Sequence, residues 1–382
     1  MFDMLRGVRV IDLSTVVLGP YATQLLGDFG AEIIKVEPPA GDVFRSSRPG
    51  RAGGDGAGFL NLNRNKKSVT LDLTDASSLS ALLELVKTAD VFVHNMRPGS
   101  ARRLGIDYPA IKAVKPDIVY CNARGFGDGP NGDEPAYDDC IQAASGLAWI
   151  NAGKDGEPRF VPSILCDKIA GLHLAYAVAA GLASRALTGE GAAIETPMYE
   201  TMVSFLLLEH LGGKTFPESG GEMGYMRLFS PNRRPFRTKD GWVAMLPYTR
   251  IHWQRFLAIV GLDHLAEDPL VTDAELRASR IDELYAIVAE QSPMRTSAEW
   301  LDLLRAEGIP CAPVRELKDL LDDPQLVEGG MFGTIEHPAE GTLRTVRSPF
   351  GVTGHAALPD RPAPVLGADT EEVLGSLPPP AS

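Results

Sequence analysis

The chain has 382 residues, of which 44% are hydrophobic and 23% are charged. This composition is that of an ordinary globular protein and excludes a low-complexity or largely disordered chain. The 37 basic and 50 acidic residues give a formal net charge of −13, opposite in sign to that of a general nucleic-acid-binding protein. An anionic ligand must therefore be held by local groups of Lys, Arg and backbone N–H.

Cysteine spacing and hydropathy indicate the cellular compartment. Cys121, Cys140, Cys166 and Cys311 stand far apart and form no C-x-x-C pair, which argues against a zinc ribbon or a secreted disulfide scaffold. The first residues lack the apolar segment of a secretory signal. The most apolar run, 169–183, is shorter than the roughly 20 residues that span a bilayer, and it predicts a buried helix. We therefore expect a cytoplasmic protein with no membrane partner.

Strand-like and helix-like segments alternate along the first third of the chain. Apolar runs typical of strands occur at 8–14, 32–38, 68–73, 90–95 and 117–123. Between them, apolar residues recur at helical spacing at 21–31 and 78–89. Strands that alternate with helices form crossover units, so we expect an α/β fold with a mainly parallel sheet. A Gly-rich stretch at 46–58 predicts a mobile loop.

The rest of the chain predicts a second group of elements. A long Ala-rich helix follows Asp167, and another helical stretch covers 197–211. After a Gly-rich loop come one strand and three amphipathic helices, at 241–247, 250–260, 273–290 and 297–307. The change in composition predicts a large domain over 1–224, a smaller domain over 225–320 and a C-terminal segment over 321–382.

One nucleotide-binding motif matches only in part. Gly127-x-Gly129-x-x-Gly132 has dinucleotide-binding spacing and follows a strand, but Pro130 removes a backbone donor and no helix clearly begins there. The sequence contains no G-x-S-x-G or H-E-x-x-H motif, and its seven His residues are scattered. We therefore expect neither a nicotinamide cofactor nor a metal site.

The segment Pro162–Lys168 leads into the Ala-rich helix and contains the residue best suited to chemistry, Asp167. One interpretation is structural, because Asp is among the best acceptors for the free N–H groups at a helix start. The other is catalytic: those N–H groups and the macrodipole favour an ionised carboxylate aimed at a ligand, and such a carboxylate can be a covalent nucleophile. Cys166 is a rival nucleophile, although an apolar setting raises the pKa of a thiol and favours packing.

Eight ordered blocks resemble one known family. They read GVRVIDLSTVVLGPYATQLLGDFGAEIIKVEPPAGD, NLNRNKKSVTLDL, VFVHNMRPGSARRLGIDY, PAYDDCIQAASGL, LCDKIAGLHLA, GIPCAPVREL, DDPQLVEGGMF and APVLGADTEEVL. Together they are similar to the class III CoA-transferases, the superfamily of formyl-CoA transferase, carnitine CoA-transferase and α-methylacyl-CoA racemase. The blocks cover nearly the whole chain, so the resemblance identifies the superfamily. It identifies the individual enzyme within the superfamily less specifically.

The resemblance implies a Rossmann-like large domain, a smaller α+β domain and two chains interlocked in a homodimer. The N-terminal part and the C-terminal segment would share the large domain. Asp167 would attack the donor thioester to give an aspartyl–acyl anhydride, and the CoA thiolate would convert this to an aspartyl-CoA thioester. The acceptor carboxylate would then attack, and the thiolate would collect the new acyl group. Coenzyme A enters as a co-substrate, so no tightly bound cofactor is implied.

The resemblance also carries over a set of site residues. Those for coenzyme A are Val17, Leu18, Leu71, Asp72, Leu73, Thr74, Asn95, Met96, Arg97 and Arg103. Tyr137 and Asp138 correspond to an aromatic–acid pair beside the reacting centre. Gly220 and Gly221 correspond to a loop that would supply backbone donors or shield the site from water.

Simpler interpretations of these positions stay open. Arg97 and Arg103 are either phosphate ligands or solvated charges at helix ends, and Leu71 belongs equally well to a core. Lys66 and Lys67 are either further phosphate ligands or parts of an exposed turn.

Two departures from the family narrow the activity. Formyl-CoA transferase has Gln at the position of Val17 and Arg at that of Pro38, which argues against formyl and oxalate as substrates. The racemase branch has a catalytic His where this chain has Tyr137, and racemisation needs two proton-transfer groups on opposite faces of the α-carbon.

We therefore expect a CoA-transferase that moves CoA from an acyl-CoA to a free carboxylic acid, with a small dicarboxylate such as succinate as one partner. Arg227, Arg233 and Arg234 either bind that acid or are surface charges. The alternatives are α-methylacyl-CoA racemisation and intramolecular CoA transfer. A second alternative is CoA binding without catalysis.

Overall fold

The computed structural model describes residues 1–152 and 156–377. Their contacts divide the chain into two units, the first of residues 1–152, 158–205 and the segment from Pro324 onward, and the second mainly of Leu206–Asp323. The boundary between Phe205 and Leu206 lies inside the helix Met198–His210, whereas the change in composition predicts a domain boundary after residue 224. The cause is local: the His210 ring near the end of that helix lies 5.3 Å from the Phe229 ring, so this half of the helix packs with the loop that follows it.

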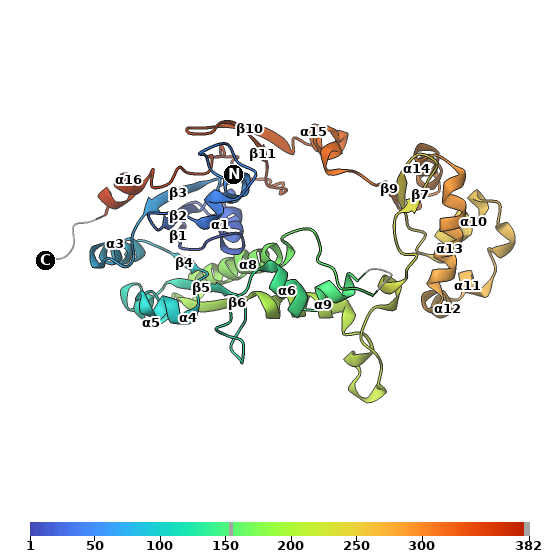
Figure 1. Cartoon of the computed structure of the whole chain (residues 1–382), viewed down its shortest axis with the longest axis horizontal. Helices are drawn as coiled ribbons and strands as arrows, with labels where there is room; N and C mark the ends of the chain where they lie inside the picture. The colour runs from blue at the N-terminus through green and yellow to red at the C-terminus, as the bar shows by residue number, and fades with distance from the viewer. Residues whose placement is uncertain (153–155, 378–382) are drawn as a thin grey trace. The chain divides into compact units, whose positions relative to one another are not determined.

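A parallel sheet of six strands forms the centre of the first unit (Figure 1). The strands are β1 (Arg9–Asp12), β2 (Glu32–Glu37), β3 (Lys66–Thr70), β4 (Val91–His94), β5 (Val119–Arg124) and β6 (Ala192–Pro197). Their order is β3-β2-β1-β4-β5-β6, and every neighbouring pair is parallel. This order is that of a Rossmann fold. In that fold the order in which successive strands join the sheet reverses between β1 and β4, and ligands bind there, beyond the carboxyl ends of the strands. The expected α/β fold is confirmed.

Among the described residues, nine α-helices of the first unit precede its C-terminal segment. They are α1 (Leu18–Asp28), α2 (Ala57–Leu62), α3 (Ala76–Lys87), α4 (Pro98–Arg103), α5 (Tyr108–Val114), α6 (Asp138–Ala144), α7 (Leu147–Ile150), α8 (Leu165–Thr188) and α9 (Met198–His210), with a 3-10 helix η1 (Val43–Ser46). Helix α9 crosses the boundary between the two units. Within the described residues, the crossover helices therefore supply cover for both faces of the sheet.

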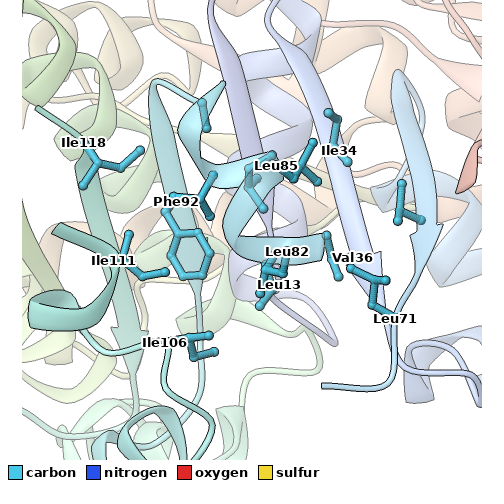
Figure 2. Close-up of a cluster of buried hydrophobic side chains, with 14 of the residues drawn as sticks. Leu13, Ile34, Val36, Leu71, Leu82, Leu85, Phe92, Ile106, Ile111 and Ile118 are labelled. Carbon is cyan, nitrogen blue, oxygen red and sulfur yellow. The ribbon is translucent and has the colours of Figure 1, made fainter. Parts of the chain in front are cut away.

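One face of the sheet packs against α3 and α5 (Figure 2). Ile34 and Phe92 on the strands contact the same buried cluster as Leu82 and Leu85 of α3 and Ile111 of α5. Each of these side chains is almost completely buried. Burial of side chains of this size stabilises the fold by roughly 1.5–3 kcal/mol each.

The opposite face packs against α1 and α8. A Cβ added at Gly181 of α8 would lie 2.6 Å from Val119 and 3.1 Å from Ile194, so the helix backbone sits directly on β5 and β6. The sequence predicts a buried helix here, but only 33% of the most apolar window of α8 is buried. Leu172 and Tyr176 are 48% and 75% exposed. By length and composition α8 is apolar enough to cross a membrane, although it packs on α1 and on the sheet.

The C-terminal segment returns to the edge of the same sheet, where α16 (Thr370–Gly375) lies beside β3 (Figure 1). Its other elements are α15 (Pro324–Glu328) and the antiparallel hairpin of β10 (Phe332–His337) and β11 (Gly341–Val346). The backbone N–H of Ser68 donates to Asp369 at 2.8 Å, and that of Thr70 donates to Thr370 at 3.0 Å. Strand β3 therefore has partners on both edges.

The second unit has a small antiparallel sheet in the order β7-β8-β9. Its elements are β7 (Phe236–Arg237), β8 (Trp242–Met245), β9 (Cys311–Pro313), α10 (Arg250–Ile259), α11 (Pro269–Thr272), α12 (Ala274–Ser279), α13 (Ile281–Gln291) and α14 (Ser297–Ala306), with 3-10 helices η2 (Gly212–Thr215), η3 (Pro217–Ser219), η4 (Met226–Phe229), η5 (Asp263–Leu265), η6 (Ser292–Met294) and η7 (Leu317–Asp322). Trp253, Phe256 and Trp300 form the centre of its core. The single helix expected at 273–290 is wrong, because Arg280 leaves the helical conformation (φ −116°, ψ 27°) between α12 and α13.

Candidate active site

The starts of two helices meet in the first unit, and one of them carries Asp167. This residue is the third of α8, and its side chain is 9% exposed. Ile164 occupies the N-cap position, so Asp167 is not the cap of its own helix. One turn further on, a Cβ added at Gly171 would lie 2.7 Å from the carbonyl oxygen of Leu18. The absence of a side chain at Gly171 therefore lets α8 approach the first turn of α1.

The Asp167 carboxyl consequently faces the start of α1. The backbone N–H of Leu18, the first residue of that helix, points to the carboxyl and favours its ionised form. The α1 N-terminus carries part of the positive end of the helix dipole, which acts in the same direction. The N-cap residue Val17 supplies no side-chain hydrogen bond, so the first turn of α1 keeps N–H groups for a partner outside the helix.

Asp138 holds the backbone of Asp167 from a third helix. Its Oδ1 accepts a 3.1 Å hydrogen bond from the Asp167 N–H, and its Oδ2 accepts a 2.7 Å bond from Nε2 of Gln142. Gln142 is completely buried, and its Oε1 accepts from the Val161 N–H at 2.8 Å. Asp138 and Gln142 therefore fix the segment that enters α8. Gln142 was not among the residues predicted for the site, although its position four residues after an Asp on a helix is a known pairing pattern.

Two influences raise the pKa of Asp167 to about 7. Burial is the larger, the negative charge of Asp138 adds to it, and the Leu18 N–H acts in the opposite direction. The sequence-based expectation that the helix start keeps this carboxylate ionised is therefore wrong for the free protein. Near neutral pH the carboxyl divides between its two protonation states.

The rival nucleophile Cys166 is inert by the same physics. Its side chain is completely buried, and burial together with the Asp138 and Asp167 charges raises its pKa to about 12. A thiol with such a pKa has almost no thiolate near neutral pH. Of the two side chains, Asp167 is therefore the better candidate for a nucleophile.

The residues expected to bind coenzyme A follow β1, β3 and β4 at the carboxyl edge of the sheet. Val17, Leu18 and Leu71 are buried, and Leu73 packs against the hydrophobic core. Their side chains thus serve the core. Any contact with a ligand would come from their backbone.

Polar groups in the same loops already form hydrogen bonds within the protein. The exposed Thr74 donates to Asp72 through both its N–H (3.0 Å) and its hydroxyl (2.6 Å). The Met96 N–H donates to Nδ1 of His94 at 3.1 Å. Burial lowers the pKa of His94 to about 4, so this ring is neutral and fixes the turn that carries Met96.

Three expected site residues point into solvent. Arg97 and Arg103 are exposed; Arg97 donates to the Asp133 carbonyl at 3.4 Å, and Arg103 donates to the Ser100 hydroxyl at 3.2 Å. Tyr137 precedes Asp138 and is 68% exposed. All three side chains are accessible to a ligand from outside the unit.

Lys66 is neither a phosphate ligand nor part of an exposed turn. Its ammonium is completely buried and donates to Asp12, Pro20, Thr23 and Asn63. Burial is the main cause that lowers the pKa of Lys66 to about 8. Lys67 is largely covered and forms ion pairs with Glu32 (3.1 Å) and Glu372 (2.9 Å).

The remaining expected residues lie in the second unit. Gly220 has a left-handed backbone (φ 64°) at the end of η3, and Gly221 lies against Gly213, where a Cβ would be 2.7 Å from its Cα. Arg233 and Arg234 line a hollow with Phe236 and Tyr285. In the described residues, no group of three or more His, Cys, Asp and Glu side chains has metal-binding geometry.

Comparison with known proteins supplies independent information. The family model of CoA-transferase family III matches residues 5–370. Succinyl-CoA:glutarate CoA-transferase of Homo sapiens is 31% identical over 378 residues, which cover 97% of this chain and 85% of that protein. Formyl-CoA:oxalate CoA-transferase of Streptomyces coelicolor is 30% identical over 396 residues, which cover 98% and 95%. A crystal structure of Rv3272 from Mycobacterium tuberculosis matches with a TM-score of 0.83 and 31% identity, covering 96% and 98%.

The first prediction concerns stability. A carboxyl whose pKa is raised from 3.8 to about 7 binds its proton more tightly in the folded protein, so stability falls as pH rises through that range. The full effect is roughly 4 kcal/mol. We expect the free energy of unfolding of Asp167→Asn, relative to the natural protein, to increase by about this amount between pH 4 and pH 8. Urea denaturation at a series of pH values measures it, and a constant difference would contradict the burial argument.

A second prediction isolates the Asp138 charge. Replacing Asp138 by Asn removes a negative charge that faces Asp167, so the pKa of Asp167 should fall. The measurement is the pH midpoint of the stability difference between Asp138→Asn and the double variant that also carries Asp167→Asn. The matched control is Asp139→Asn, which removes the same charge from the exposed neighbouring position. A midpoint that moves equally in both variants would show that net charge, not the Asp138 contact, sets the pKa.

Proposed function

The chain belongs to CoA-transferase family III, and we propose that it moves coenzyme A between two carboxylic acids through covalent intermediates on Asp167. The observation that carries the proposal is the pairing of a buried carboxyl with the Leu18 N–H, beyond the carboxyl ends of a Rossmann-type sheet. A nucleophile and a backbone donor then face the same space, as acyl transfer requires.

The reaction proceeds by exchange of acyl bonds. An oxygen of the Asp167 carboxylate attacks the thioester carbonyl of the donor, the C–S bond breaks, and an aspartyl–acyl anhydride and CoA thiolate result. The thiolate attacks the aspartyl carbonyl, which releases the donor acid and leaves an aspartyl-CoA thioester. The acceptor carboxylate attacks this thioester to form a second anhydride. The thiolate then takes the acceptor acyl group and restores Asp167.

The surroundings of Asp167 suit both halves of this cycle. A carboxylate of raised pKa is a stronger nucleophile than an ordinary Asp, because nucleophilicity rises with basicity. The Leu18 N–H and the α1 dipole would stabilise negative charge on the aspartyl oxygen in the two tetrahedral intermediates that form at the aspartyl carbonyl. In the other two intermediates the charge develops on the acyl oxygen of the donor or the acceptor. Asp138 keeps the Asp167 backbone fixed while the side chain exchanges partners.

Coenzyme A is a polyanion, so its phosphates need cations on this acidic protein. Arg97 and Arg103 are exposed at the two ends of α4, directly after β4, and we assign them to the phosphates. The backbone of the loop at Leu71–Thr74, after β3, lies at the same edge of the sheet and would hold the nucleotide. The buried Lys66 takes no part.

The relatives favour a dicarboxylate. The name of the human relative states succinyl-CoA and glutarate, whereas that of the Streptomyces relative states formyl-CoA and oxalate. Val17 and Pro38 depart from the formyl-CoA transferase pattern, so we propose succinyl-CoA as donor and a small dicarboxylate as acceptor. The roles that the resemblance implies for Arg227, Arg233 and Arg234 and for the Gly220–Gly221 loop stay predictions.

We further propose a homodimer that uses the exposed side of α8. Leu172, Tyr176 and Phe350 line an apolar hollow of about 380 Å³ together with residues of α1. Apolar side chains gathered on one face of a helix typically mark an interface between proteins. Two interlocked chains would bury this face.

The central prediction is tested with purified protein, succinyl-CoA and isotopically labelled glutarate, with labelled glutaryl-CoA measured by mass spectrometry. The natural protein should form it. Asp167→Asn should lower the rate at least about 1,000-fold, because the nucleophile is lost. Hydroxylamine added during turnover should yield a hydroxamate at Asp167 only. Asp139→Asn is the control and should retain transfer.

Other outcomes select the alternatives. Solvent deuterium that enters the α-position of a 2-methylacyl-CoA, without exchange between acids, would identify a racemase. CoA that migrates within one molecule and never reaches labelled acid would identify an isomerase. Binding of CoA with no exchange in either assay would leave a non-catalytic binding protein. A hydroxamate or adduct at Cys166 in place of Asp167 would overturn the mechanism.

The dimer has its own test. Replacing Leu172 and Tyr176 together by Glu places two charges in the apolar hollow, so the mass in solution should fall from twice 41.0 kDa toward 41.0 kDa. Leu187→Glu is the control, because this residue is 88% exposed at the far end of α8 and does not line the hollow. Sedimentation equilibrium distinguishes the two masses. A natural protein that sediments as a monomer would refute the proposed interface.

A further inference from the structure

The turn between β1 and α1 has an unusual backbone at Val16. Its φ is 71°, in the left-handed region, and Val is β-branched. A bulky residue rarely adopts this strained conformation, which persists only where surrounding contacts impose it. The turn ends at Leu18, the first residue of α1, whose N–H faces Asp167.

Asp42 imposes this conformation from one side. Both of its carboxylate oxygens accept from the Val16 N–H, at 3.1 and 3.3 Å. Its Oδ2 also accepts from Nζ of Lys35 at 2.9 Å, and the same Nζ donates to the Ser14 carbonyl at 2.7 Å. The side chains of Asp42 and Lys35 are completely buried. The pair therefore holds the turn at two backbone positions without contact with solvent.

Asn95 holds the same turn from the opposite side. Its Oδ1 accepts from the Thr15 N–H at 3.0 Å, and its Nδ2 donates to the Thr15 carbonyl at 2.9 Å. Asn95 follows β4, the strand beside β1 at which the sheet order reverses. Both polar atoms of the side chain are thus engaged by the turn. Asn95 therefore has a contact with the turn in addition to the coenzyme A contact that the resemblance implies.

The turn leaves little room for other conformations. A Cβ added at Gly19 would lie 2.2 Å from the Cβ of Ser14, so the chain folds back on itself between these residues. With Thr15 and Val16 fixed by side chains from two other loops, the direction of the Leu18 N–H is determined before any ligand binds. Backbone donors that are fixed in advance stabilise developing charge without reorganisation.

We infer that Asp42 and Asn95 are positioning residues for acyl transfer, which hold the Val16 turn so that the Leu18 N–H stays aimed at the Asp167 carboxyl. The inference rests on the proposed role of Asp167. It goes beyond that role because neither residue reaches Asp167 itself. Lys35 supports Asp42 by the direct ion pair.

The protonation of Asp167 reports the direction of that N–H. Three groups face the carboxyl: the Asp138 carboxylate from α6, the neutral Cys166 thiol on its own helix, and the Leu18 N–H from α1. A variant that turns the N–H away, while Asp138 stays in place, should raise the pKa of Asp167. Mere loss of folded protein would lower all rates equally and leave the pKa unchanged.

The test uses Asp42→Asn and Asn95→Leu, which break the two sides of the turn separately. Asn95→Leu leaves every buried charge paired, so it stays informative if Asp42→Asn is poorly folded. Each should lower kcat about 10- to 100-fold with less than about a threefold change in the KM for succinyl-CoA. In each, the pH midpoint of kcat/KM should move above that of the natural protein, as should the midpoint of the stability difference caused by adding Asp167→Asn.

The matched control is Asp28→Asn. Asp28 is also a buried carboxylate of α1 that pairs with a cation, Arg64, at 2.5 Å, but it does not contact the turn. This variant should lose thermal stability and keep both pH midpoints. If Asp42→Asn and Asn95→Leu behave like this control, the positioning role is wrong while the role of Asp167 stands. If Asp167→Asn retains transfer, the proposed mechanism fails first.

Discussion

The site depends on the contact between the first turns of α1 and α8. Gly171 allows the two backbones to approach, and this closeness places the Leu18 N–H opposite the Asp167 carboxyl. Neither helix start has a side-chain cap of its own, so each leaves N–H groups for a partner from elsewhere. The Asp167 side chain faces the Leu18 N–H at the start of α1, and the Asp138 side chain accepts a hydrogen bond from the Asp167 N–H at the start of α8. At this candidate site, side chains from other helices therefore cap both helix starts.

Opposing electrostatic effects then set the reactivity of Asp167. A helix start alone would stabilise the anion and make it a weak nucleophile, whereas burial and the Asp138 charge destabilise the anion. The balance places the pKa near 7, where an appreciable fraction is ionised and that fraction is basic enough to attack a thioester. A bound polyanion such as coenzyme A would shift this balance again through its own charge. If Arg97 and Arg103 bind its phosphates as proposed, they would affect the chemistry as well as the affinity.

Most of the sheet was predictable, because strands that are buried on both faces are nearly continuous apolar runs. β6 was not, since its sequence AAIETP has neither strong alternation nor a run of large apolar residues. The start of α1 at Leu18 was also missed, because helical spacing was recognised only from residue 21, although Pro is tolerated in a first helical turn. Asp167 was identified from its sequence block. Its pKa was not, because Asp138 is 29 residues away and meets it only in the fold.

The charged interior beneath the site has a physical reason. Lys66, Lys35 and their carboxylate partners are completely buried, and an apolar cluster of the same volume is often as stable as a buried ion pair, or more so. Apolar side chains, however, have no acceptor for the Val16 N–H and no donor for the Ser14 carbonyl, which the turn leaves without helix or sheet partners. An irregular turn at the carboxyl edge of a sheet needs such partners inside the protein. The buried ion pairs therefore lie beneath the candidate site, because the Val16 N–H and the Ser14 carbonyl beside it have no hydrogen-bond partners in a helix or sheet.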